Sequence, residues 1–315
     1  MLFITSTRKD LNKQSNLRWI LLVCLLGFGA LIIILFYRGK KTPALHSTLA
    51  PLFQVLGRST RGADIAITKL LPIDMEDEKR YGNILAVYYQ SDTTDKDYIY
   101  LNKIIKNIST FAKKPFTYRV FLVDYYDPNA FALPGGIICV TKGLLSTMKS
   151  EDEIVSVLGH EMGHIENGHC FEAVKFELAA RKIHMNTLGE LADFTLRFFL
   201  NHSFSKTQEN EADEYGYQLL LLTSYDPAGF ANAFKHLYTF QTDSMQRPER
   251  SHAELVRDYF MSHPPLPLRI QEFEEKAKVW ASDHQGDKRY VGTRNFAERV
   301  PFSDKAYPQE WIIVK

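Results

Sequence analysis

The stretch that decides the fold is Ser150–His169, which reads SEDEIVSVLGHEMGHIENGH. Two of its three histidines, His160 and His164, are four positions apart, and on an α-helix this spacing places both side chains on one face. Imidazole is a good ligand for Zn²⁺, and a catalytic zinc site takes three protein ligands and keeps one position for water. Glu161, beside the first histidine, is placed to act as general base toward that water. We therefore expect a metal centre built on this helix.

The same stretch carries a signal for the start of a helix. Ser150 followed by Glu153 matches a capping box, in which the serine side chain caps the helix and the glutamate reaches back to it. Acidic residues follow Ser150 directly, and Glu166 lies near the end of the stretch. These charges predict a helix that faces water, which argues against an intramembrane protease whose zinc helix spans the bilayer.

The third ligand has to come from another segment. An acidic cluster, ENEADE at 209–214, lies in a stretch that we expect to be helical over 206–222. Glu209 would complete a set of two histidines and one glutamate, and Glu211 is the alternative ligand. Asp213, one turn after Glu209, is placed to accept a proton from a zinc-bound histidine. Without the histidine pair, such a cluster would indicate only a solvated acidic face.

Four blocks of sequence resemble one known family. They are NAFALPGG at 129–136, the helix at 150–169, Glu209-x-x-Ala212-Asp213, and a weaker SHPP at 262–265 followed by Arg269 and Ile270. Over roughly residues 80–280 the chain resembles the gluzincin zinc metalloendopeptidases of the HtpX, CAAX prenyl protease, BepA and OMA type. The resemblance implies a zincin-like fold, hydrolysis of peptide bonds, and one Zn²⁺ per chain on His160, His164 and Glu209.

The resemblance also implies roles for residues outside the zinc helix. An extended edge strand beside the metal would pair with the backbone of a substrate and hold it straight. The residues expected to bind substrate in this way are Phe131, Ala132, Leu133, Pro134 and Gly135. His263 and Arg269 are placed near the zinc by the same resemblance, where one of them would donate a hydrogen bond to the developing oxyanion. His263 has a second interpretation, as a cap over the zinc that keeps the enzyme latent.

Near the N-terminus, residues 19–37 read WILLVCLLGFGALIIILFY and carry no charge. At about 1.5 Å per residue this run nearly matches a hydrocarbon core of about 30 Å. Trp19 and Tyr37 stand at its ends, where aromatic residues favour the membrane interface. The residues after it fit a signal-peptide cleavage site poorly, so we expect an uncleaved anchor in the lipid bilayer. A single anchor is closer to the BepA and OMA branch of the family.

The flanking charges give a weak indication of orientation. Four Lys and Arg residues precede the run and three follow it closely, which favours a cytoplasmic N-terminus and a translocated body. We expect a single-pass protein of the bacterial inner membrane with an extracytoplasmic catalytic domain, or, as the alternative, one of the mitochondrial inner membrane.

Composition limits the class of protein. The 315 residues carry 38 Lys and Arg against 37 Asp and Glu, a net charge of +1, which argues against a nucleic-acid partner. With 45% hydrophobic and 13% aromatic residues, the chain has ample surface to bury, and its three cysteines exclude a disulfide framework. We expect an α+β fold: a mainly helical zincin-like metallopeptidase domain with a small β-sheet, preceded by one transmembrane helix.

The expected plan of the chain has five parts. They are an N-terminal tail at 1–18, the anchor at 19–37, a juxtamembrane stem at 38–80, the zinc metallopeptidase domain at 81–285, and a C-terminal tail at 286–315 without an assigned role. The expected strands are Ile84–Tyr89, Tyr118–Asp124 and one extended segment over Phe131–Val140, whose Pro and Gly residues suit an edge strand. The other expected helices cover 98–111, 170–200, 206–222, 229–240 and 267–280.

Together these features predict a membrane-anchored zinc-dependent metalloendopeptidase. Its substrates would be extended or misfolded polypeptides near the bilayer, in quality control of membrane or envelope proteins, with membrane proteins as further partners. The alternative is a zinc-stabilised chaperone-like or docking protein that binds extended polypeptides without cutting them. A Glu161→Gln variant discriminates between the two, because only an enzyme loses cleavage when its general base is removed.

Overall fold

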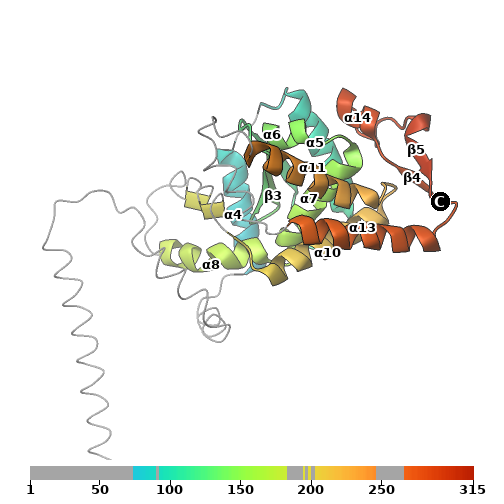
Figure 1. Ribbon diagram of the computed structural model, residues 1–315. Helices are drawn as coiled ribbons and strands as arrows, with labels where there is room; N and C mark the ends of the chain where they lie inside the picture. Colours follow the sequence, from blue (N-terminus) through green and yellow to red (C-terminus); the bar gives the residue numbers. More distant parts are fainter. Residues whose placement is uncertain (1–73, 90–91, 183–193, 196–197, 200–202, 246–265) are drawn as a thin grey trace, which may run out of the picture. The chain divides into compact units, whose positions relative to one another are not determined.

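A computed structural model describes residues 74–89, 92–182, 194–195, 198–199, 203–245 and 266–315 (Figure 1). These residues lie in one compact unit, Ile67–Lys315. The expected anchor, most of the expected stem and His263 lie outside the described residues. Within the described part, no helix combines the length and the apolar character needed to cross a membrane.

Helix α7, Glu151–Glu166, lies at the centre of the described unit, and all of its residues from Glu151 to Ile165 are buried. It packs against α10 (Lys206–Leu222), α11 (Ala228–Met245) and two strands of the main sheet. The expectation of a water-facing helix is therefore wrong. The acidic first turn is covered by other parts of the chain, which supply hydrogen-bond donors to it.

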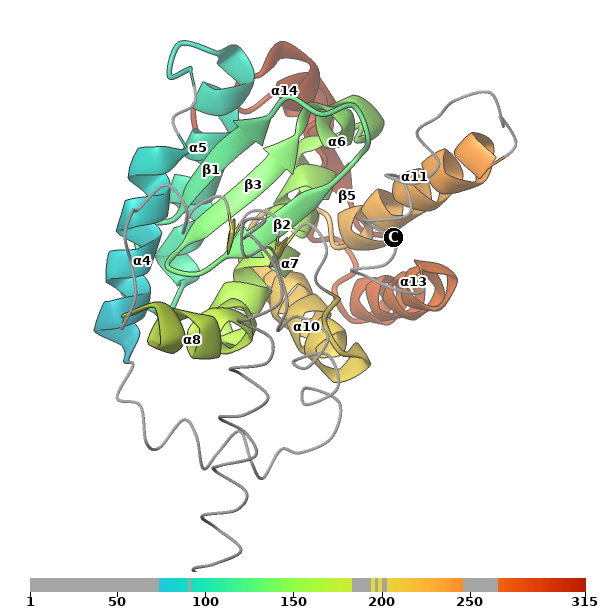
Figure 2. The same ribbon diagram turned by 90° about the vertical axis from the view of Figure 1, so that its left-hand side faces the viewer.

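The main sheet has three strands, β1 (Arg119–Val123), β2 (Ala130–Leu133) and β3 (Ile137–Thr141), in the order β1-β3-β2. The β1 strand runs parallel to β3, and β2 runs antiparallel to it. In Figure 2 the three strands lie in front of α7. The β2 strand pairs with β3 alone among the described strands, so it is the edge strand that the sequence predicted.

The segment Phe131–Val140 is not the single extended piece that the sequence predicts. It forms a hairpin, in which Pro134-Gly135-Gly136 is the turn between β2 and the central strand β3. Gly135 and Gly136 have φ angles of 79° and 92°, a left-handed conformation that glycine adopts without strain. The two glycines therefore reverse the chain and do not weaken an edge strand.

The expected strand Ile84–Tyr89 is wrong, because this segment belongs to helix α4, Met75–Tyr88. Asp74 caps the helix by accepting hydrogen bonds from the backbone N–H groups of its first turn, and Asp77 reaches back to complete a capping box. The buried positions recur at helical spacing and are Glu78, Tyr81, Gly82 and Leu85. The apolar run at the end of the helix is too short to distinguish a strand from a helix by composition.

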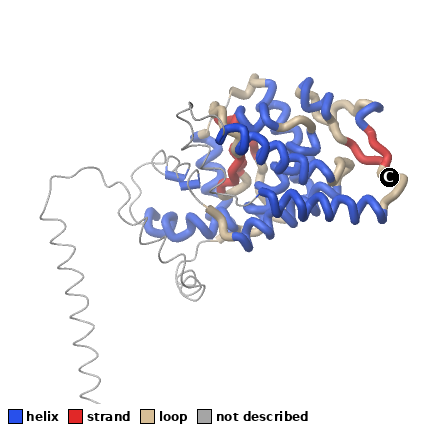
Figure 3. The backbone as a smooth tube through the Cα atoms, in the orientation of Figure 1, coloured by secondary structure: helices blue, strands red, loops and turns tan. Residues whose placement is uncertain are grey.

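The other helices lie largely where the sequence places them. They are α5 (Lys96–Ile108) with a 3₁₀ turn at Ser109–Phe111, α6 (Lys142–Thr147), α8 (His169–Lys182), α10, α11 and α13 (Leu266–Asp283). The expected helices at 98–111, 206–222, 229–240 and 267–280 are confirmed, and α8 confirms the first part of 170–200. Figure 3 shows two groups of strands, in red, separated by helices in blue.

The second group of strands belongs to the C-terminal residues, which pack against the start of α7. It consists of β4 (Lys288–Tyr290) and β5 (Trp311–Ile313), with helix α14 (Thr293–Glu298) between them. Tyr290 is fully buried, and its ring contacts those of Phe302 and Trp311. These residues form part of the same compact unit as the metal centre.

The start of α7 is capped by this C-terminal segment. The backbone N–H of Glu151 donates to the carbonyl of Gly292 at 3.2 Å, and that of Asp152 donates to the carbonyl of Val291 at 3.1 Å. The predicted capping box is wrong, because the Ser150 hydroxyl donates to the Asp152 carboxylate and makes no capping bond. The free amides of the first turn are satisfied by partners distant in sequence.

The buried carboxylate of Glu151 connects three parts of the fold. It accepts hydrogen bonds from the hydroxyl of Tyr100 at 2.7 Å, from the hydroxyl of Tyr225, and from the backbone N–H of Phe302 at 2.7 Å. Burial raises the pKa of this carboxyl above its ordinary value, although the three hydrogen bonds act in the opposite direction. Glu151 thus ties α7 to α5 and to the C-terminal segment.

Candidate metal centre

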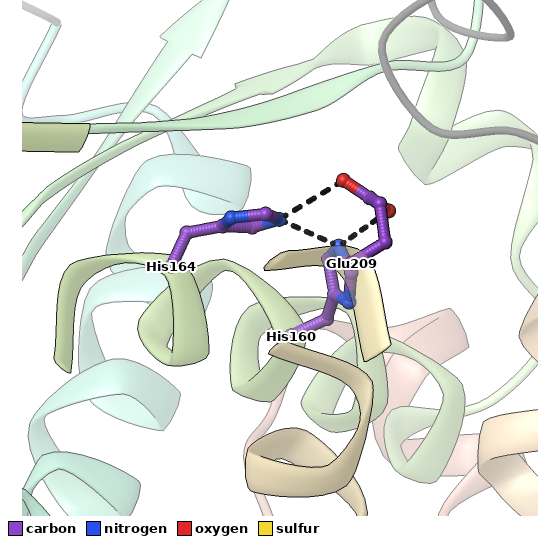
Figure 4. A group of neighbouring side chains, drawn as sticks. All are labelled: His160, His164 and Glu209. Carbon is purple, nitrogen blue, oxygen red and sulfur yellow. Dashed lines mark hydrogen bonds and ion pairs between the residues drawn. The ribbon is translucent and has the colours of Figure 1, made fainter. Parts of the chain in front are cut away.

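Three buried side chains meet between α7 and α10. The rings of His160 and His164 project from one face of α7, and the carboxylate of Glu209 projects from the first turn of α10 toward both rings (Figure 4). One ligand atom from each of the three lies within 4.8 Å of the others. All three side chains are at most 5% exposed.

The spacing of these atoms fits a tetrahedral zinc ion. The two Nε2 atoms are 3.2 Å apart, His164 Nε2 lies 3.3 Å from Glu209 Oε1, and His160 Nε2 lies 3.8 Å from Glu209 Oε2. Zinc–ligand bonds of about 2.0–2.1 Å in a tetrahedral arrangement separate neighbouring ligand atoms by about 3.3 Å. The donor set of two imidazoles and one carboxylate is also one that zinc enzymes use for catalysis.

Small residues allow α7 and α10 to approach closely enough to bring the ligands together. A Cβ added at Gly163 would lie 2.7 Å from the carbonyl oxygen of Ala212, and one added at Gly216 would lie 2.7 Å from the backbone nitrogen of His160. Gly159 faces the Cα of Gly216 in the same crossing. Any larger side chain at these positions would push α10, and Glu209 with it, away from the histidines.

His160 is oriented by a buried carboxylate. Its Nδ1 lies 2.8 Å from Asp213 Oδ1, so Nδ1 carries the proton and Nε2 offers its lone pair to the metal. Arg269 grips Asp213 from the other side, with Nε 2.7 Å from Oδ2 and Nη2 2.5 Å from Oδ1. Burial alone would raise the pKa of Asp213, but the Arg269 charge and the His160 hydrogen bond outweigh it and hold that pKa below its ordinary value.

His164 has a different set of neighbours. Its Nδ1 lies 3.1 Å from Nδ1 of His169, whose Nε2 lies 3.0 Å from Glu211 Oε2. Gly168, with φ of 80°, turns the chain between α7 and α8 and so brings His169 back over His164. The ring of Phe204 stacks on that of His164, with ring centroids 3.9 Å apart. Burial lowers the pKa of His169, although Glu211 acts in the opposite direction.

Comparison with known proteins identifies the family. The model of peptidase family M48 matches residues 96–277, more than half of the chain. The chain belongs to peptidase family M48. The matched region contains the sheet, both helices of the metal centre and Arg269.

Several curated relatives in this family are named as proteases. Metalloprotease LoiP of Escherichia coli is 34% identical over 134 residues, 39% of this chain and 52% of LoiP. Mitochondrial metalloendopeptidase OMA1 of Schizosaccharomyces pombe is 29% identical over 202 residues, 62% of this chain and 56% of OMA1. Metalloprotease YcaL of Escherichia coli is 27% identical over 176 residues, 51% of this chain and 62% of YcaL. The chain thus spans about half to three-fifths of the length of these relatives.

Glu161, the general base that the sequence predicts for this M48 chain, is buried beside the proposed ligands. Glu161 lies on α7 next to His160 and is 1% exposed. Its charge reaches two buried thiols, Cys139 on β3 and Cys170 on α8, whose pKa values are raised first by burial and further by Glu161. Glu161 therefore lies on the side of α7 that faces the sheet and the start of α8.

The other predicted residues of the M48 chain occupy distinct places. The residues Phe131, Ala132 and Leu133 lie on β2, which packs against α7, and Pro134 and Gly135 lie in the following turn. Arg269 lies in the first turn of α13 with 5% exposure, against Asp213 and 3.5 Å from Glu209. This position differs from that of a donor to substrate, because the guanidinium lies against the carboxylates that surround His160. His263 lies outside the described residues.

Sequence reasoning did not group His169, Phe204 and the four small residues of the helix crossing with the site. A third histidine directly after a glycine was a signal for His169, since such a glycine favours a reversal of the chain. Gly159 and Gly163 inside a helix were a signal for a close contact, because glycine otherwise weakens a helix. Nothing in the local sequence pointed to Phe204.

Proposed function

We propose that this protein is a zinc metalloendopeptidase that hydrolyses peptide bonds. The observation that carries the proposal is the buried group of two imidazoles and a carboxylate, whose ligand atoms lie within 4.8 Å of one another and so close enough to share one zinc ion. Zn²⁺ in such a site supplies a Lewis acid that polarises a carbonyl and lowers the pKa of water toward neutrality. Membership of a peptidase family and the names of the relatives support the same activity.

In this proposal the side chains have separate tasks. His160, His164 and Glu209 hold the metal. Glu161 accepts a proton as water attacks the peptide carbonyl, and then delivers a proton to the leaving amine. Asp213 positions His160, and Arg269 positions Asp213 in turn, so we assign Arg269 a positioning role in place of the expected oxyanion donor.

We further propose that the substrates are extended or misfolded polypeptides close to a membrane. The β2 strand lies at the edge of its described sheet and against α7, where a substrate strand would add to it through backbone hydrogen bonds. Backbone pairing selects extended segments with little discrimination between side chains. The uncharged run at 19–37 supports a membrane anchor.

The proposal is tested by replacing the general base without changing its size. The Glu161→Gln variant should bind one zinc ion per chain as the wild type does, and its cleavage of a chemically unfolded protein should fall by about 10²–10⁴-fold. Glu214→Gln, an exposed change on α10, should cleave at the rate of the wild type. Full cleavage by Glu161→Gln would remove Glu161 from the role of base.

The same pair of proteins tests the alternative and the membrane setting. A non-enzymatic chaperone predicts that wild type and Glu161→Gln protect an unfolded protein from aggregation equally and that neither cuts it. Comparison of new N-termini in cells that carry either protein would identify the substrates. Alkaline extraction of membranes should leave the full chain in the pellet and release a variant that lacks residues 19–37.

A further inference from the structure

The Nδ1 atom of His164, the second proposed zinc ligand, faces another imidazole, that of His169. His169 is 4% exposed, and it stands between buried His164 and the carboxylate of Glu211, which is 55% exposed. The chain Glu211–His169–His164 thus leads from the surface of α10 to the metal centre through two hydrogen bonds of 3.0 and 3.1 Å. This arrangement differs from the direct contact of Asp213 with His160.

The positions of the protons in this series of hydrogen bonds follow from the carboxylate at its outer end. An ionised carboxylate only accepts hydrogen bonds, so Nε2 of His169 must carry a proton and donate it to Glu211. A neutral His169 then has a bare Nδ1, which accepts a hydrogen bond from Nδ1–H of His164. With its proton on Nδ1, His164 presents the lone pair of Nε2 toward Glu209 and His160, where a metal ligand needs it.

We propose that Glu211 and His169 are positioning residues that fix the tautomer and the ring orientation of His164, so that its Nε2 is ready to bind zinc. This inference rests on the proposed zinc site and deepens it. Of the two zinc-binding histidines, His160 is oriented directly by a carboxylate, and His164 is oriented by a carboxylate acting through a second imidazole. Glu211, which the sequence suggests as an alternative ligand, thus acts on the metal site through His169.

The test compares variants of His169 that keep or remove the acceptor. In the full chain, His169→Phe retains the size of the ring but offers no acceptor to Nδ1–H of His164. We expect its zinc affinity, measured by competition with a chelator, to fall about 10–100-fold, the range found when partners of metal-binding histidines are removed. His169→Asn places a carbonyl oxygen near the position of Nδ1, so it should recover most of the affinity.

The outer end of the chain is tested in the same assay. Glu211→Ala should weaken zinc binding, whereas Glu211→Gln, which keeps an oxygen acceptor, should stay closer to the wild type. Glu214→Ala is the matched control, because it removes an exposed carboxylate from the same helix that bonds to Lys276 and lies outside the site. It should bind zinc as the wild type does.

A spectroscopic readout separates positioning from packing. Substituted Co²⁺ should give a changed visible absorption spectrum in His169→Phe and a spectrum like that of the wild type in His169→Asn. Equal zinc affinity of His169→Phe and wild type would overturn the inference, as would an equal loss in His169→Phe and His169→Asn. Failure of the wild type itself to bind zinc would overturn the proposed function, and this result is distinct from both.

Discussion

At the scale of single residues, the candidate metal centre includes charged side chains beyond the three proposed ligands. Arg269 spans Asp213 with two hydrogen bonds, lies 3.5 Å from Glu209, and stacks over the ring of Phe234 at 4.0 Å. A planar guanidinium satisfies this geometry, whereas an ammonium offers one compact charge on a flexible stem. Arg269 therefore fixes the position of Asp213 and neutralises part of the negative charge of the site.

We predict that Arg269→Lys weakens zinc binding although it keeps the charge. The lysine loses the two parallel hydrogen bonds to Asp213, so His160 is held less firmly, and affinity should fall by about tenfold or more in a chelator competition. Arg294→Lys is the matched control, since Arg294 is exposed and paired with Glu298 on α14. Identical affinities for Arg269→Lys and wild type would contradict the positioning role.

A second prediction concerns Asp152, whose pKa is raised well above its ordinary value by burial and by the charge of Glu153. The folded state then holds this proton at pH values where the unfolded chain has lost it. As pH rises above the unfolded pKa of about 3.9, folding stability falls by about 1.4 kcal/mol per pH unit until the folded pKa is passed. Asparagine does not titrate, so the stability of the Asp152→Asn variant lacks this contribution to its pH dependence.

Urea unfolding at a series of pH values measures this effect. The free energy of unfolding of Asp152→Asn, relative to that of wild type, should rise with pH from about pH 4 upward. A difference that stays constant from pH 4 to pH 7 would show that Asp152 titrates alike in both states.

The residues that the sequence indicated at the site lie in pairs that are separated by one helical turn. His160 and His164 are related by one helical turn, and Glu209 and Asp213 by another, so a helix alone brings each pair to one face. His169 and Phe204 reach His164 through chain reversal and tertiary packing, and no periodic pattern encodes such contacts. The sequence therefore indicated the ligands better than the residues that orient them.

At the scale of elements, the crossing of α7 and α10 builds the site. The contact passes through Gly159, Gly163, Ala212 and Gly216, none of which carries a side chain larger than a methyl group. The distance between these helices sets the distance from Glu209 to the histidines. Close packing of small residues thus has a chemical consequence, because it determines whether three ligands can share one ion.

We predict that Gly163→Ala damages both the fold and the metal centre. The new methyl group would lie 2.7 Å from the Ala212 carbonyl oxygen, and overpacking of this kind costs about 1–3 kcal/mol. Relief of the clash moves α10 outward, so zinc affinity should fall as well. Thermal unfolding and chelator competition measure the two effects separately.

Gly143→Ala provides the comparison for that experiment. Its methyl group would clash with the carbonyl oxygen of Tyr126, which is not part of the α7–α10 crossing. This variant should lose stability, and its folded fraction should bind zinc with the affinity of the wild type. A parallel loss of affinity in both variants would show that instability alone, and not the helix separation, controls the metal centre.

The sequence predicted helices better than it predicted their ends and the small strands. The helices at 98–111, 206–222 and 267–280 have a regular apolar spacing that their packing preserves. The run Ile84–Tyr89 is apolar along its length, and only the capped turn at Asp74 shows that it continues a helix. The capping box at Ser150 failed because the amides of α7 found carbonyl partners far away in the chain.

At the scale of the whole described unit, the C-terminal residues complete the fold around α7. Tyr290 is fully buried, donates its hydroxyl proton to Asn295 Oδ1 at 2.5 Å and accepts from the backbone N–H of Tyr307 at 2.9 Å. Phe302 packs on its ring and also donates its backbone N–H to Glu151. A segment without periodic signals thus extends the hydrophobic core at the N-terminal end of α7.

We predict that Tyr290→Ala destabilises the protein by about 3–5 kcal/mol, the cost of truncating a large buried aromatic side chain. Ile313→Ala is the control in the same segment, because Ile313 is 62% exposed and should change stability by no more than about 0.5 kcal/mol. Denaturant unfolding of both variants measures the difference. Equal stabilities would show that the C-terminal core contributes nothing to the fold.

The capping of α7 by Val291 and Gly292 also bears on when this helix can be completed during synthesis of the protein. Ribosomes make a chain from its N-terminus, so the helix that bears the metal ligands emerges long before the carbonyls that complete its first turn. Until the segment at 291–292 has been made, the amides of Glu151 and Asp152 lack the two carbonyls that cap them in the folded protein. The first turn of the helix therefore reaches its final hydrogen bonding only after that segment has been translated.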